Sequence, residues 1–148
     1  MSKGAKQEKK GGEAWPSGLE RTLFSPVLRT ELKECILGKR YDLSFAFVPP
    51  REMRKAMAYK RPKLRAAQMK EASNVLSFPL SKTSGEILIC KSTARAQCNN
   101  FGMDYQTFLA YLFIHGSLHL KGLDHGATME HEESRVMRRF GLRVDESR

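Results

Sequence analysis

The sequence has little cysteine and no long apolar run. Its three cysteines, Cys35, Cys90 and Cys98, are odd in number and form no C-x-x-C pair. This excludes a disulfide framework and favours reduced, largely buried thiols. No stretch of about 18 apolar residues exists, so a membrane span is not expected. Residues 1–18 are rich in lysine and glycine and lack the apolar core of a secretory signal. We therefore expect a disordered basic tail and a cytoplasmic protein with no membrane partner.

Acidic residues are scarce relative to basic ones. The chain has 148 residues, with 16 Asp and Glu against 26 Lys and Arg, which gives a formal net charge of +10. Between Pro49 and Ala72 the acids are Glu52 and Glu71, whereas the bases are Arg51, Arg54, Lys55, Lys60, Arg61, Lys63, Arg65 and Lys70. A solvated helix face would carry more evenly mixed signs. The excess therefore predicts a polyanionic partner, with nucleic acid as the leading candidate.

Apolar periodicity and turn residues predict three strands and five helices. The strands are expected over residues 43–48, 74–78 and 85–90, the second closed by Pro79 and paired with the third as a hairpin. Expected helices run from Ser25 to Gly38, over 51–59, from Ser92 to Gly102, from Asp104 to Gly122 and from Thr128 to Gly141. This order predicts an α/β or α+β fold. A single domain over residues 19–148 would pack a small mixed sheet with about five helices.

Three of the four histidines lie in the segment HGSLHLKGLDH, residues 115–125. His115 and His119 stand at i and i+4, so they share one face of the predicted fourth helix. Gly122 allows the chain to leave that helix, and the turn can bring His125 round as a third ligand. The spacing H-x-x-x-H-x-x-G-x-x-H is that of the metzincin proteases, which bind catalytic zinc. It predicts one zinc ion per chain at the C-terminal end of this helix.

The number of zinc ligands and the residue after the first histidine both indicate which reaction the site could catalyse. Three protein ligands leave a fourth position open, which is typical of catalytic zinc; a closed structural site would need another ligand, such as His131 or Asp124. Zinc proteases have a general-base glutamate directly after the first histidine, whereas this chain has Gly116. The basic stretch then favours a phosphodiester over a peptide as the substrate.

Two segments match the motifs of a known family. HGSLHLKGLDH matches H-G-x-L-H-L-x-G-x-D-H, and NVLSFP at residues 74–79 matches T-[DN]-V-L-S-F-P, with Ser73 in place of the usual threonine. GEILIC resembles the strand that follows in the family, and Met129 with Glu133 matches its M-x-x-x-E. From about Leu43 to Leu142 the chain resembles the YbeY family of bacterial endoribonucleases that mature ribosomal RNA.

The resemblance implies a single-domain zinc enzyme that cuts single-stranded RNA, associates with ribosomal small-subunit components and acts in 16S rRNA 3′-end processing. It implies metal binding by His115, His119 and His125. A cleft arginine of the family corresponds to Arg61, or to Arg65 if the extra residues of this chain precede it. Counting forward from Met53 without a gap favours Arg61. The competing interpretations are a non-catalytic, zinc-stabilised RNA-binding factor for ribosome assembly and, third, a metalloprotease.

Overall fold

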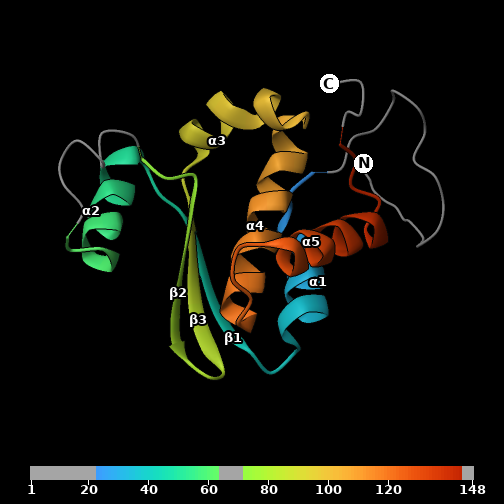
Figure 1. Ribbon diagram of the computed structural model, residues 1–148, viewed down its shortest axis with the longest axis horizontal. Coiled ribbons are helices and arrows are strands. Elements are labelled where there is room, and N and C mark those ends of the chain that lie inside the picture. Colours follow the sequence, from blue (N-terminus) through green and yellow to red (C-terminus); the bar gives the residue numbers. More distant parts are fainter. Residues whose placement is uncertain (1–22, 64–71, 145–148) are drawn as a thin grey trace.

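The computed structural model describes residues 23–63 and 72–144, which form one α+β domain (Figure 1). The predicted basic tail, Arg65 and Lys70 lie outside these residues. In chain order the elements are α1 (Pro26–Leu37), β1 (Asp42–Phe47), α2 (Pro50–Lys60), β2 (Val75–Ser81), β3 (Ser84–Ile89), α3 (Lys91–Gln97), the 3₁₀ helix η2 (Cys98–Phe101), α4 (Tyr105–Lys121) and α5 (Ala127–Arg139). The predicted fold class is confirmed.

The three strands form one mixed sheet in the order β1-β3-β2. β1 runs parallel to β3, and β2 pairs with β3 as the predicted antiparallel hairpin. The prediction that Pro79 ends the second strand is wrong, because β2 continues to Ser81. β2 is an edge strand whose register becomes irregular between Pro79 and Ser81. A proline is tolerated there since its missing N–H removes no bond from a central ladder.

Both ends of α4, the helix that carries two of the histidines, agree with the sequence, and so does the start of α1. Asp104 caps α4 by accepting a hydrogen bond from the Thr107 backbone N–H at 2.8 Å. Gly122 ends α4 with φ +113°, a left-handed conformation that favours glycine. Ser25 caps α1 in the same way as Asp104, through the backbone N–H of Leu28. Side-chain capping signals are local, which is why they can be read directly from the sequence.

Two predicted helix starts are wrong. The third helix begins at Lys91 with Cys90 as its N-cap, so Ser92 lies inside the helix rather than capping it. It also gives way to η2 at Cys98 instead of continuing to Gly102. The last helix follows Gly126 directly and needs no cap from Thr128. β3 leads into α3 through Cys90 alone, and α5 follows the positive-φ Gly126, so both helices begin before the residue whose side chain could have capped them.

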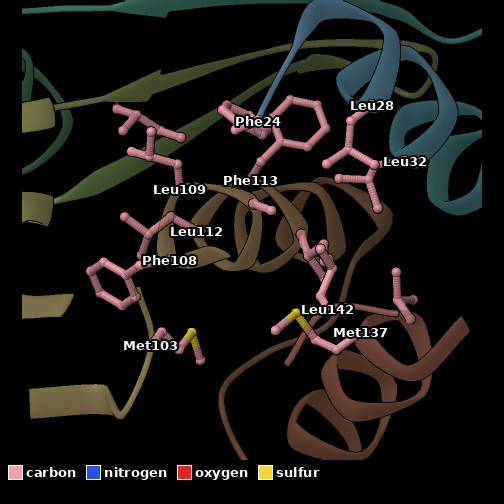
Figure 2. Close-up of a cluster of buried hydrophobic side chains, with 14 of the residues drawn as sticks. Phe24, Leu28, Leu32, Met103, Phe108, Leu109, Leu112, Phe113, Met137 and Leu142 are labelled. Atoms are coloured by element: carbon pink, nitrogen blue, oxygen red, sulfur yellow. The ribbon is translucent and has the colours of Figure 1, made fainter. Parts of the chain in front are cut away.

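α4 lies at the centre of the domain, between the sheet and the helices α1 and α5 (Figures 1 and 2). Ten of its 17 residues are buried, so most of its circumference is covered by neighbours. Figure 2 shows the apolar side chains at its contacts: Phe108, Leu112 and Phe113 belong to α4 itself, and neighbouring segments contribute Phe24, Leu28, Leu32 and Met137. This packing fixes the orientation of α4 and therefore of the histidines that it carries.

The other face of the sheet packs against α2. Met53 and Met57 of α2 are buried with Leu76 of β2 in a second apolar cluster. Side chains of a strand alternate between its two faces, so Val75 and Ser77 point to α4 while Leu76 points to α2. The sheet is thus a thin layer between the basic α2 and the histidine-bearing α4.

The cysteines agree with the expectation of reduced, largely buried thiols. Cys90 and Cys98 are buried, Cys35 is partly buried, and all three are free. Within residues 23–63 and 72–144, no helix is both long and apolar enough to cross a bilayer.

Candidate metal centre

α4 places His115 and His119 side by side. Their ring centroids are 4.6 Å apart, and their Nε2 atoms approach to 3.1 Å. Both imidazoles are only partly exposed. The predicted i, i+4 pairing on one helix face is therefore confirmed as geometry.

A Schellman-type turn at the end of α4 brings in the third histidine. The backbone N–H of Gly122 donates to His119 O, and that of Leu123 donates to Leu118 O at 3.0 Å. The chain reverses there, which puts the His125 ring 4.6 Å from that of His119 and 5.2 Å from that of His115. One ligand nitrogen from each histidine lies within 4.8 Å of the others, so the cluster could hold a metal ion.

The Nδ1 atoms of His115 and His119 point away from the cluster, and each has a hydrogen-bond acceptor in the protein. His115 Nδ1 donates to the Glu133 carboxylate, and His119 Nδ1 donates to Leu123 O at 2.9 Å. These partners assign the ring protons to Nδ1 and leave both Nε2 atoms without hydrogen. Two such acceptors facing each other at 3.1 Å repel unless a cation lies between them. The donor set therefore fits a bound metal ion.

The pKa of His119 is lowered. Burial of the ring is the main cause, the charges of His115, His125 and Lys60 add to it, and the hydrogen bond to Leu123 opposes it. Only a neutral imidazole can donate a lone pair to a metal, so this environment favours the binding form of the ring.

The contact between Glu133 and His115 was not predicted from the sequence. The helix dipole alone would account for acids near the start of the last helix, yet Glu133 is 6% exposed and faces α4. Its carboxylate accepts from His115 Nδ1 and, at 3.4 Å, from the Tyr111 hydroxyl. Burial and the Glu133 charge raise the pKa of Tyr111 to about 12, so the phenol remains a donor. The i, i+4 spacing from buried Met129 was the available signal for an inward-facing carboxylate.

Gly116 marks the closest approach of α4 to the sheet. A Cβ at this position would lie 2.9 Å from Ser77 Oγ and 3.4 Å from side-chain carbons of Val75 and Ile87. The Ser77 hydroxyl also donates to Gly116 O at 2.9 Å. A glutamate here would be forced against the sheet, so the position after the first histidine has no room for the zinc proteases' general base.

The alternatives for a fourth ligand find no support among the described residues. His131 is exposed on α5 and does not join the cluster, and Asp124 is exposed beside His125. The group of potential ligands within residues 23–63 and 72–144 consists of the three histidines alone. Such a set leaves room for a non-protein ligand.

The basic end of α2 lies across β2 from this cluster. Arg61 is exposed, ends the helix, and lines a small pocket with Met57, Lys60, Ser73 and Leu76. No contact between Arg61 and the histidines is present in the described residues. Lys60 is linked to the cluster, because its ammonium group donates to Ser77 O, which belongs to the strand that contacts α4, and its charge contributes to the lowered pKa of His119. The structure thus brings the three predicted histidines together, whereas Arg61 lies outside their cluster, at the exposed end of α2.

Comparison with known proteins identifies the family. A family model described as "Endoribonuclease YbeY" matches residues 7–141. A protein of that name from Caldanaerobacter subterraneus subsp. tengcongensis is 30% identical over 150 residues, which cover 86% of this chain and 90% of the relative. Another from Staphylococcus aureus is 28% identical over 152 residues, covering 90% and 91% respectively. A third, from Sulfurimonas denitrificans, is 38% identical over 79 residues, or 49% of this chain and 57% of that protein. With a match over most of its length, the chain belongs to the endoribonuclease YbeY family.

Proposed function

We propose that the protein is a zinc-dependent endoribonuclease that cuts single-stranded RNA in 16S rRNA 3′-end maturation and ribosome biogenesis. The observation that carries the proposal is the convergence of three imidazoles, two with bare Nε2 atoms, beside a strongly basic helix end. Membership of an endoribonuclease family gives this site its reaction class.

One zinc ion per chain would be held by His115, His119 and His125. Tetrahedral zinc with bonds of about 2.0–2.1 Å separates its nitrogen ligands by roughly 3.4 Å, close to the 3.1 Å between the two Nε2 atoms. Three imidazoles leave one position open, as in catalytic zinc sites. A zinc ion here supplies Lewis acidity towards a phosphoryl oxygen or an attacking oxygen nucleophile.

The chain's own groups prepare this site and bind the strand. Glu133 and the Leu123 carbonyl fix the rings of His115 and His119 from behind, which keeps each Nε2 directed at one point. Arg61 is exposed and free to form a bidentate pair with the scissile phosphate, where it stabilises charge that develops in the transition state. The basic residues between Pro49 and Ala72 neutralise flanking phosphates.

The proposed domain comprises residues 19–148 and follows a basic tail at residues 1–18. Its partners are ribosomal RNA and components of the small ribosomal subunit, in the cytoplasm. A formal charge of +10 suits a protein that works on a polyanionic particle.

The test uses the purified, zinc-loaded full chain on one RNA in two forms, single-stranded and annealed to its complement. We expect cleavage of the single-stranded form only, loss of cleavage on chelation, and recovery when zinc is restored. Zinc-dependent RNA binding without cleavage would favour the assembly-factor interpretation instead. Cleavage of an unfolded protein substrate but not of RNA would favour a metalloprotease.

A further inference from the structure

Ser77 of β2 connects the end of α2 to the histidine-bearing helix. Its carbonyl oxygen accepts a hydrogen bond from Lys60 Nζ, and its hydroxyl donates to Gly116 O at 2.9 Å. Gly116 directly follows His115 in α4. The ammonium group of Lys60 is therefore held on the same strand residue that touches the helix beside the histidine cluster.

The position of this ammonium group is defined by two contacts. Besides its bond to Ser77 O, Lys60 Nζ lies 5.1 Å from the centroid of the Phe78 ring, within cation–π range. β2 is an edge strand, so no further strand covers its outer side among the described residues. An ammonium group has three N–H donors, and the bond to Ser77 uses one of them. Within residues 23–63 and 72–144 the other two have no hydrogen-bond partner, so they can donate to an anion.

The charge of Lys60 is not neutralised by a carboxylate in the described part of the chain. Ser77, which accepts from this ammonium group, also donates to the backbone of Gly116 beside His115, so the charge lies at the strand that contacts α4. Burial, and then the neighbouring charge of Arg61, lower the pKa of Lys60 itself. Such a crowded positive region attracts an anion to the edge of β2.

We propose that Lys60 is a phosphate-binding residue of the active site, donating to a non-bridging oxygen of the RNA phosphate held at the histidine cluster. It complements Arg61, the exposed residue that caps the same helix end. The inference rests on the proposed function, because it assumes that the anion at the cluster is a phosphodiester. A solely structural role for Lys60, tethering α2 to the edge of β2, is the competing explanation.

The variant Lys60→Gln separates the two roles. Glutamine keeps an N–H donor, on a side chain one atom shorter than that of lysine, but it has no charge. Lys60→Arg restores the charge, and Lys39→Met removes a lysine near β1, at the opposite edge of the sheet, as a matched control. Zinc content and the thermal unfolding midpoint of each full-length variant would show that the site and the fold persist.

The primary measurement is the dissociation constant of inorganic phosphate from the zinc-loaded protein, obtained by calorimetric titration. We expect Lys60→Gln to weaken phosphate about ten- to a hundredfold, the range for one hydrogen bond to a charged group. Lys60→Arg should recover most of the affinity, and Lys39→Met should match the wild type. Unchanged phosphate affinity in Lys60→Gln would overturn the inference and assign Lys60 to the tether alone.

A second measurement separates this inference from the proposed function. On single-stranded RNA, Lys60→Gln should lower kcat/KM by a factor similar to its loss of phosphate affinity. If the wild type cuts no RNA, the proposed function fails, yet the phosphate titration still decides whether Lys60 binds an anion there. If RNA cleavage is intact in Lys60→Gln, Lys60 does not contact the scissile phosphate.

Discussion

His115 and Glu133 face each other between α4 and α5, with the imidazole Nδ1 against the carboxylate Oε2. The contact gives a buried carboxylate a partner and directs the opposite ring nitrogen into the histidine cluster. Carboxylate–histidine pairs of this kind set the tautomer and orientation of metal-binding imidazoles. The last helix therefore contributes to the site although it provides no ligand.

Replacing Glu133 with glutamine should weaken zinc binding about ten- to a hundredfold, the usual effect of losing such a partner. The amide accepts from Nδ1 less strongly and cannot stabilise the ring by its charge. Competition with a chromophoric chelator would measure the affinity. Glu132→Gln is the matched control, because Glu132 pairs with Arg135 on the exposed side of α5. Equal affinities for the two variants would remove Glu133 from the site.

Replacing His119 with alanine should abolish the bound zinc. The variant retains two ligands, one of them on a turn, and two imidazoles make a poor zinc site. Metal analysis of the purified protein should give one zinc per chain for the wild type and close to none for the variant. His131→Ala, which removes an exposed histidine of α5, should retain the metal. A full zinc complement in His119→Ala would refute the ligand assignment.

The parts of the site that depend on one helix and one turn were predictable from sequence. The i, i+4 pair on α4, the stop at Gly122 and the return of His125 follow from helical geometry and from the left-handed conformation of glycine. Contacts between separate helices and strands could not be predicted from the sequence. Glu133 reaches His115 only because α5 crosses α4 at that level, and Ser77 meets Gly116 across 39 residues of chain. No local periodicity carries that information.

Replacing Gly116 with alanine should destabilise the fold by about 1 kcal/mol net. Alanine improves helix propensity by about 1 kcal/mol, but overpacking at a tight contact typically costs 1–3 kcal/mol. The new Cβ displaces the Ser77 hydroxyl from its bond to Gly116 O. Denaturant unfolding would measure the change.

The Ser77→Ala background provides the control for that prediction. With the hydroxyl gone, Gly116→Ala should become neutral or stabilising, and the double-mutant cycle should show a coupling of about 1–2 kcal/mol. Additive effects of the two substitutions would mean that the contact between Ser77 and residue 116 does not set the packing of α4 on β2.

The salt dependence of RNA binding tests the basic stretch between Pro49 and Ala72. Replacing Lys63 and Lys70 with glutamine should reduce the slope of log K against log salt by about 1.4, since each phosphate contact on a single strand contributes roughly 0.7. Affinity should fall for all sequences alike. The same double change at Lys39 and Lys82, outside the stretch, should leave the slope unaltered. An unchanged slope in the first variant would place the RNA surface elsewhere.

The final prediction concerns Arg61, whose exposed guanidinium at the end of α2 is proposed to pair with the scissile phosphate. A group that acts mainly in the transition state lowers the cleavage rate more than RNA affinity when it is lost. Lysine cannot reproduce the planar bidentate fork. Arg61→Lys should therefore cleave about a hundredfold more slowly, the scale of losing one preorganised donor.

Arg65→Lys is the informative comparison for that variant, because these two positions are our alternatives for the cleft arginine that the resemblance to the family implies. Zinc content and RNA affinity of both variants should remain close to wild type, so that single-turnover cleavage reports on chemistry. Full activity in Arg61→Lys with a loss in Arg65→Lys would place the extra residues of this chain before the arginine. Normal cleavage by both variants would mean that neither arginine acts in the transition state, and the positive charge at the scissile phosphate would then fall to Lys60 and the metal.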